Sequence, residues 1–284
     1  MVRSRMTPHT APAMTETAYF LPLGDERLFA FLHRPEGPCR GGAVLCAPLA
    51  EEKLWSHRVF VSFARELAAR GYAVLRFDYR GEGDSDRPFE QSDLATRLQD
   101  TGAAIDELKR RVPELDQVTL VGLRLGATIA AAVAAKRDDI DRLVLWDPVI
   151  DGADYMQSVL RTNLMAQMAI HRKVLESREQ LVERLDRGET VNVEGYQVSG
   201  PLFRSVSGLR LSDLLTAGKR PCQIVSITAR PGPPRDDFAA LVSTFAHVQV
   251  SGAVEEAFWK EIKTFYQRAA DLFRVTFEWL GVVA

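Results

Sequence analysis

The sequence predicts an α/β protein with a mostly parallel sheet that helices cover on both faces. Two observations carry this prediction. Short continuous apolar runs, typical of fully buried strands, occur at residues 43–46, 73–77, 118–121, 143–146 and 223–227. Segments with helical apolar spacing lie between them, at 56–70 and 94–111. Strands that alternate with helices in this way form a parallel sheet with helices on both sides.

The remaining segments complete the expected order of elements. Two short strands open the fold at 18–21 and 28–33, and a strand at 247–250 and a long helix at 258–280 close it. The alternation stops near residue 150, where helices at 155–175 and 178–187 precede an extended piece at 191–196. We therefore predict a disordered leader at 1–15, a core at 16–149 and 220–284, and a helical cap inserted at 150–219.

The bulk composition limits the partners and the compartment. A formal charge of -2 argues against a nucleic-acid or anionic-membrane partner, and no apolar run is long enough to span a bilayer. The odd number of cysteines without metal-like spacing (Cys39, Cys46, Cys222) indicates reduced thiols in a cytoplasmic protein. We expect a small-molecule or protein partner and no cofactor, and the sequence leaves a homodimer open.

The motif that organises the chain is the run Gly122-Leu123-Arg124-Leu125-Gly126. It follows a buried strand and leads directly into a helix of small residues, which is the layout of a nucleophile elbow. The two glycines fit the close approach of strand and helix. The central residue, however, is arginine, whose guanidinium stays protonated and can neither attack a carbonyl nor accept a proton.

The order of elements resembles the α/β-hydrolase fold, and the run F-D-Y-R-G-E-G-D-S at 77–85 is typical of that superfamily. More narrowly, five short motifs resemble the family called exosortase A system-associated hydrolase, type 2. These motifs are A-E-E-K at 50–53, G-L-R-L-G-A at 122–127, L-W-D-P-V at 145–149, E-G-Y at 194–196 and A-F-W at 257–259. The resemblance covers nearly the whole chain and implies a bacterial protein of the serine-aminopeptidase-like branch. It transfers a fold rather than an activity.

A catalytic triad on this fold needs a nucleophile at the elbow, an acid after a later strand and a histidine after the last strand. The nucleophile position holds Arg124. No carboxylate follows the strand at 223–227 until Asp236, although Asp147 fits the alternative acid position. Residues 251–256 contain no histidine, and His247 begins the last strand at its wrong end. Two of the three triad members are therefore missing.

A cation at a helix N-terminus opposes the helix dipole, so Arg124 needs an acidic partner or an anionic ligand. The candidate partners are Glu51, Glu52, Asp147, Glu255 and Glu256. We expect Arg124 to pair with one or two of them and, with the backbone amides of its helix, to recognise a carboxylate or phosphate. The alternative is a purely structural ion pair that holds the elbow shut.

The candidate site residues follow from this hypothesis. Those assigned to catalysis are Arg124, Glu51, Glu52, Glu256 and Asp147. Those assigned to ligand binding are Leu123, Leu125, Pro48, Leu49, His57, Glu255 and Trp259. No metal ligand is assigned.

Other reactive or aromatic residues have a simpler interpretation beside the functional one. Cys46 could attack as a thiolate, but a buried cysteine is usually an apolar side chain. His57 could be a general base or could decorate its helix, and Ser85 is expected to bond the local backbone. Ser56 and Ser251 are candidate displaced nucleophiles by location alone. The aromatic residues Trp146, Tyr196, Phe258 and Trp259 are expected to pack the core and cap junction, or to line a pocket.

Two classes of function remain. The first is an enzyme acting on an ester, thioester or amide of an anionic small molecule, in which Arg124 binds an anionic group or oxyanion and Glu51, Glu52 or Glu256 serves as acid or base. The second is a catalytically inactive descendant that binds an acidic metabolite or a protein partner. In either class a Ser-His-Asp mechanism is not available.

Overall fold

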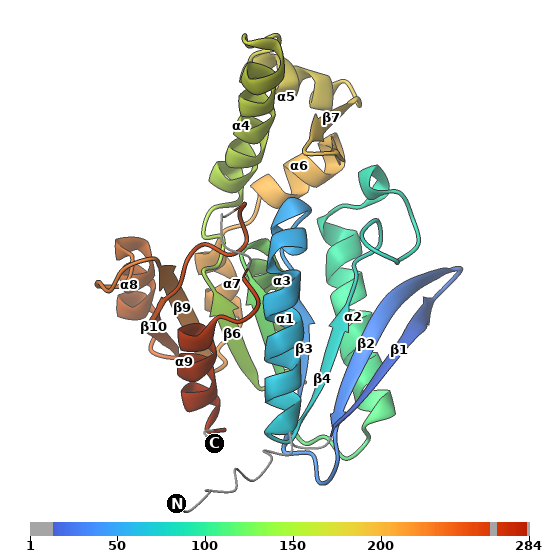
Figure 1. Cartoon of the computed structure of the whole chain (residues 1–284), viewed down its shortest axis with the longest axis vertical. Helices are drawn as coiled ribbons and strands as arrows, with labels where there is room; N and C mark the ends of the chain where they lie inside the picture. The colour runs from blue at the N-terminus through green and yellow to red at the C-terminus, as the bar shows by residue number, and fades with distance from the viewer. Residues whose placement is uncertain (1–13, 262–265, 283–284) are drawn as a thin grey trace, which may run out of the picture.

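The computed structural model describes residues 14–261 and 266–282. Its centre is an eight-stranded sheet in the order β1-β2-β4-β3-β5-β6-β9-β10, in which only β2 runs antiparallel to its neighbours (Figure 1). The strands are β1 (Met14–Leu23), β2 (Glu26–Pro35), β3 (Gly41–Cys46), β4 (Tyr72–Phe77), β5 (Val118–Leu123), β6 (Arg142–Trp146), β9 (Cys222–Thr228) and β10 (Val248–Val254). The mostly parallel sheet confirms the predicted fold class.

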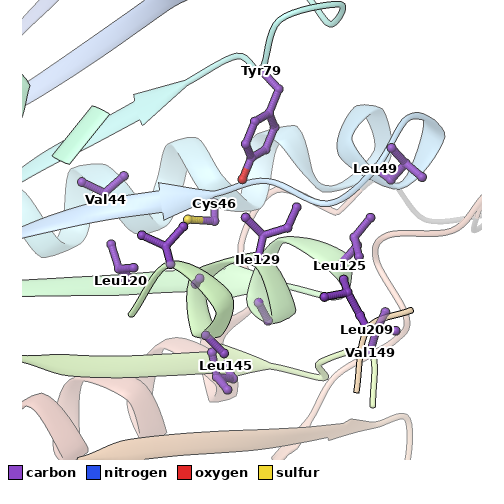
Figure 2. Packing of buried hydrophobic residues seen from close by; sticks show 14 of the residues in the cluster. Val44, Cys46, Leu49, Tyr79, Leu120, Leu125, Ile129, Leu145, Val149 and Leu209 are labelled. Carbon is purple, nitrogen blue, oxygen red and sulfur yellow. The ribbon is translucent and has the colours of Figure 1, made fainter. Parts of the chain in front are cut away.

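Helices cover both faces of this sheet. The core helices are α1 (Glu51–Ala69), α2 (Leu94–Arg111), α3 (Leu125–Ala134), α8 (Asp236–Thr244) and α9 (Ala270–Leu280), with a short 3-10 turn at Phe89–Gln91. One apolar core contains residues of α1 and α9, and Trp146 there packs edge-on against Phe63 with ring centroids 4.7 Å apart. The other contains residues of α2 and α3, and Figure 2 shows Cys46 and Ile129 within it.

The turn between β5 and α3 has the geometry that its glycines predict. A Cβ atom on Gly122 would lie 2.5 Å from the backbone of Ala127, and one on Gly126 would collide with the carbonyl oxygens of Cys46 and Ala47. Only glycine therefore lets the strand, the helix and the end of β3 approach so closely. Arg124 between them has φ 54° and ψ -123°, a strained backbone for a residue with a side chain.

The segment between β6 and β9 rises above the sheet (Figure 1). It comprises α4 (Gly152–His171), α5 (Arg178–Asp186), the hairpin β7 (Thr190–Val193) and β8 (Tyr196–Ser199), α6 (Gly200–Ser207) and α7 (Leu211–Ala217). Side chains fix two of its helix starts: Asp151 accepts from the amides of Ala153 and Asp154, and Ser177 forms a capping box with Gln180. Helix α7 packs against α3. The domain boundaries predicted at 150 and 219 stay a prediction.

Three local predictions were wrong. The closing helix begins at Ala270, because Phe258 and Trp259 pack together in a turn that includes a bond from the Lys260 amide to the Ala257 carbonyl. Strand β10 extends to Val254, so Ser251 lies within the strand rather than after it. Residues 14 and 15 of the predicted leader belong to β1, paired with Pro35 and Arg34, and residues 1–13 lie outside the described residues.

Candidate functional site

The elbow places Arg124 at the carboxyl edge of the sheet. Its backbone amide donates to the Trp146 carbonyl at 3.0 Å, which joins the turn to the end of β6. Two neighbouring residues, Ala50 before α1 and Asp147 after β6, also have positive φ, at 51° and 41°. Strained backbone of this kind clusters at functional sites. Residues with positive φ thus follow β3, β5 and β6, and Arg124 is the central one of the three.

Two carboxylates hold the guanidinium of Arg124. Its Nη1 lies 2.9 Å from Asp147 Oδ2 and 3.0 Å from the Asp147 carbonyl oxygen, and its Nε lies 3.4 Å from Glu52 Oε1. The pairing predicted from the helix dipole is confirmed for Glu52 and Asp147. Aromatic rings complete the surroundings, since the guanidinium carbon lies 5.4 Å from the centre of the Trp259 ring and 5.9 Å from that of Tyr155.

Burial and charge act against each other in this cluster. Burial alone would lower the pKa of Arg124, but the negative charges of Glu52 and Asp147 outweigh it and raise that pKa. Burial raises the pKa of Glu52 although Arg124 and a hydrogen bond from Tyr155 oppose it. Burial likewise raises the pKa of Asp147 against the charges of Arg124 and Arg235. The arginine therefore stays charged, and the two carboxyl groups lose a proton less readily than exposed ones.

Sequence analysis missed two members of the cluster. The Tyr155 hydroxyl, from the cap helix α4, donates to Glu52 Oε2 at 2.9 Å. Arg235, just before α8, places its Nη1 3.4 Å from Asp147 Oδ1. Tyr155 offered no signal beyond its place in an amphipathic helix, and Arg235 follows a proline-rich break whose path the sequence does not determine.

A cleft of about 510 Å³ opens above Arg124, between the core and the cap; it is called the elbow cleft below. Its core side comes from the start of α1, the elbow and the turn near Trp259, and its cap side from α4 and the β7-β8 hairpin. The side chains that matter for its chemistry are Glu51, Glu52, Arg124, Tyr155, Ser158, Thr162, Glu194, Tyr196, Trp259, Lys260 and Glu261. Arg124, Tyr155 and Ser158 also line a second hollow of about 410 Å³ toward Arg235.

The charges of the elbow cleft do not favour the anionic ligand that we predicted. Four carboxylates (Glu51, Glu52, Glu194, Glu261) face two cations (Arg124, Lys260), and Arg124 is already paired. Glu194, in the hairpin turn with φ 51°, has its pKa raised by burial and then by the charges of Glu51 and Glu261. An acid group entering this cleft would meet that same negative field.

The predicted binding residues separate into two groups. Leu49 and Trp259 line the elbow cleft, whereas Leu123, Leu125 and Pro48 are buried and do not. Leu123 and Leu125, on either side of Arg124, pack inward into the two cores. His57 lies on a different side of α1, in another cleft.

The two carboxylates predicted after the last strand do not reach Arg124. Glu255 accepts hydrogen bonds from the Asp271 amide, at 2.7 Å, and from the Tyr266 hydroxyl, so it orders the approach to α9. Glu256 is exposed, with no hydrogen bond or ion pair to Arg124. Because β10 continues to Val254, Glu255 and Glu256 begin the segment that leads to α9 and do not pair with Arg124.

The remaining candidate nucleophiles have structural partners. Ser85 Oγ donates to the Asp78 carbonyl at 2.6 Å, Ser56 Oγ donates to the Glu52 carbonyl at 2.7 Å, and Ser251 accepts from Gln223. Cys46 is fully buried, and burial raises the pKa of its thiol to about 12. These residues therefore have no activated nucleophilic atom in the elbow cleft.

Histidine and cysteine are absent from the described residues that line the elbow cleft. His247 lies at the opposite end of the sheet, where its carbonyl accepts from the Cys222 amide at the start of β9. Among the described residues, no group of three or more His, Cys, Asp or Glu side chains could hold a metal ion. None of the described helices combines the length and the apolar character needed to cross a bilayer.

Comparisons with known proteins find partial matches in sequence and longer matches in structure. The family described as serine aminopeptidase, S33, matches residues 55–191, a little under half of the chain. The AB hydrolase superfamily protein YisY of Bacillus subtilis is 35% identical over 92 residues, which are 32% of this chain and 32% of that protein. This match thus spans about a third of the relative's length.

Solved structures match over much more of the chain. Est1E of Butyrivibrio proteoclasticus, with ferulic acid bound, has a TM-score of 0.67 at 16% identity and covers 93% of this chain and 100% of its own. Esterase Pf2001 of Pyrococcus furiosus has a TM-score of 0.59 at 15% identity, covering 88% and 85%. At such identities the likeness shows the fold alone. Together with the eight-stranded sheet and the elbow, these matches show that this chain has the α/β-hydrolase fold.

Proposed function

We propose that the elbow cleft binds a small ester, thioester or amide, and that the protein forms no acyl-enzyme with it. The observation that carries the proposal is the engagement of Arg124 by Glu52 and Asp147 at the position of the nucleophile. The hydrolase and esterase relatives supply the expectation of an acyl compound. A cleft of about 510 Å³ under a cap has a suitable volume for a ligand of this kind.

Arg124 retains one free side for such a ligand. Its Nε and Nη1 are engaged, whereas no hydrogen bond of its Nη2 to another described residue is present. A carbonyl oxygen of the ligand would accept from Nη2, and the Trp259 and Tyr155 rings would pack against its apolar part. The four carboxylates of the cleft favour a neutral or cationic ligand over the anionic one expected from the sequence.

The first test combines binding and covalent labelling. Neutral, cationic and anionic acyl compounds are compared by thermal shift, and a fluorophosphonate probe is followed by intact mass spectrometry. Ligands at about a hundred times their Kd stabilise a protein by about 2.7 kcal/mol, a readily measured shift. We expect stabilisation by neutral or cationic compounds, weakened in Glu194→Gln for the cationic ones, and no probe adduct. Arg204→Gln, a remote surface change, is the matched control. A stoichiometric adduct would show a nucleophile that the proposal excludes.

Hydrolysis by an activated water is the second candidate. The observation that favours it is that Glu194, whose pKa is raised, lines the same cleft as Glu51, because two carboxyl groups at one site can serve as acid and base. Turnover of a p-nitrophenyl ester that falls at least tenfold in both Glu51→Gln and Glu194→Gln, but not in Arg204→Gln, would support hydrolysis. If ligands still bind but no turnover is measured, only the binding role is supported.

The narrower resemblance remains a proposal as well. The A-E-E-K, G-L-R-L-G-A and L-W-D-P-V motifs support membership of the exosortase A system-associated hydrolases, type 2. Bacterial origin, a cytoplasmic location and a homodimer stay predictions. Sedimentation of the purified chain tests the last of these.

A further inference from the structure

A second cleft, of about 620 Å³, lies on the other side of α1 from the elbow; we call it the α1-β2 cleft. Glu52 faces the elbow cleft and Lys53, the next residue of α1, faces this one. Its lining includes Phe29, Phe31, Lys53, Arg58, Arg65 and Arg76. Nothing in the proposed function uses them.

The alternation of β2 makes one wall of this cleft aromatic. Leu28, Ala30 and Leu32 point into the core on the α2 side, so Phe29 and Phe31 point to the opposite face. There they are only partly covered, since both rings line the cleft and are intermediate in exposure. Phe29 packs edge-on with Phe31, with ring centroids 6.3 Å apart. The two rings therefore give the cleft an apolar wall that a ligand can contact.

Cationic side chains from α1 and from β4, the strand beside β2, also line the cleft. Four cations (Lys53, Arg58, Arg65, Arg76) meet two carboxylates (Asp78, Asp84) in the lining. Lys53 is paired with Asp78 at 2.6 Å, and Arg65 is paired with Glu16 at 2.7 Å. Arg58 and Arg76 have no ion pair with any described residue. Two guanidinium groups are thus left for an anion.

Arg76 is the better placed of the two. Its Nε donates to His33 Nε2 at 3.0 Å, and its guanidinium carbon lies 5.2 Å from the Phe31 ring centre. Burial holds the pKa of His33 at about 4, so His33 is neutral and its Nε2 can accept this hydrogen bond without adding a second positive charge. Nη1 and Nη2 of Arg76 make no hydrogen bond to a described residue. Burial lowers the pKa of Arg76 although the charges of Asp78 and Glu16 oppose this shift, so an anionic ligand beside the guanidinium would recover free energy.

We propose that the α1-β2 cleft binds a small organic anion, a carboxylate or phosphate attached to an aromatic or acyl body. Arg76 and Arg58 hold the acid group, because planar guanidinium donors match the oxygen atoms of carboxylates and phosphates. Phe29 and Phe31 pack against the apolar body. Tyr196 lines both clefts, but Arg58, Arg76, Phe29 and Phe31 line only this one, so the proposal does not depend on what the elbow cleft binds.

The probe for this site is 1-naphthyl phosphate, measured by isothermal titration calorimetry on the full chain, with neutral 1-naphthol as the comparison. We expect the phosphate to bind at least tenfold more tightly than the naphthol. Arg76→Gln should weaken the phosphate at least tenfold, the effect of losing a charge-assisted hydrogen bond. Arg34→Gln, at an exposed ion pair with Glu114 outside the lining of this cleft, should change the affinity for the phosphate less than threefold.

Two further variants keep the test decisive. Arg58→Ala is at an exposed position that folding tolerates, and it should weaken the phosphate at least threefold even if Arg76→Gln does not fold. Lys260→Gln removes the unpaired cation of the elbow cleft and should leave the affinity unchanged. The proposal is overturned if 1-naphthyl phosphate does not bind, or if 1-naphthol binds equally well. It is also overturned if folded Arg76→Gln or Arg58→Ala binds the phosphate as tightly as the wild type, or if Lys260→Gln binds it more weakly.

Discussion

Arg124 and Asp147 form the contact that closes the elbow. The side-chain Nη1 of Arg124 bonds both the carboxylate, at 2.9 Å, and the backbone carbonyl, at 3.0 Å, of Asp147. Because φ of Asp147 is 41°, its carbonyl and its side chain turn to the same donor. An α/β-hydrolase elbow would present a nucleophile at this point. Here the same backbone geometry presents an ion pair.

A serine at position 124 will not restore hydrolysis. In Arg124→Ser the hydroxyl would occupy the elbow, but the described lining of the elbow cleft contains no histidine to take its proton. We expect turnover of p-nitrophenyl acetate no higher than that of the wild type, and no fluorophosphonate adduct, in protein shown to be folded by circular dichroism. Labelling of this variant at residue 124 would reveal a base that the structure does not place there.

Removing the charge of Arg124 will destabilise the protein strongly. Arg124→Met leaves Glu52 and Asp147 partly buried without their main counter-ion, and breaking such a pair costs about 3 kcal/mol or more. The free energy of unfolding in urea measures this. The control is Arg204→Met, because the Arg204–Asp186 pair is more than half exposed on both sides and should cost less than about 1 kcal/mol. If both variants lose a similar free energy of unfolding, the Arg124 ion pair does not behave as a buried one.

The stability of the protein will fall as the pH is lowered from about 6.5 toward 4, and His33 will account for part of the loss. Burial, with the charge of Arg76, lowers the pKa of His33 from 6.5 to about 4. The unfolded chain therefore takes up this proton at a higher pH than the folded protein. The contribution of neutral His33 to the free energy of unfolding is fully present above pH 6.5. It is lost as the pH falls through 4, and the total loss is about 3 kcal/mol.

Urea unfolding at pH 7 and pH 4.5 compares the wild type with His33→Gln. The difference between the free energies of unfolding at the two pH values should be smaller in the variant, because glutamine does not titrate. An equal pH dependence in both proteins would mean that His33 is protonated in the fold as readily as in the unfolded chain.

Two glycine substitutions will have very different effects. Gly122→Ala places a Cβ atom 2.5 Å from the backbone of Ala127 and should cost more than about 3 kcal/mol, or prevent folding. Gly252→Ala, in β10, meets nothing within 4 Å and should change stability by less than about 0.5 kcal/mol. Thermal unfolding of both variants distinguishes them. A mild effect at Gly122 would mean that the elbow can relax without Gly at this position.

The sequence alone determined the sheet and the elbow. Continuous apolar runs are buried on both faces, so they identify the parallel strands β3, β4, β5, β6 and β9 without any knowledge of their neighbours. The two glycines of the elbow report a close backbone approach that no other residue allows. The arginine between them already excluded an attacking serine. These are local properties, which the order of residues contains directly.

Only the tertiary structure decided which acids meet Arg124. Five carboxylates follow strand ends or begin α1, and their sequence positions do not distinguish them. Glu52 reaches the arginine because α1 turns it toward the elbow and Tyr155 of the cap holds it there. Glu255 and Glu256 do not, because β10 runs four residues longer than its apolar pattern indicates. The position of the Arg76 guanidinium beside two partly buried rings likewise depends on how α1 packs on β2 and β4, because ion pairs form between segments distant in the chain.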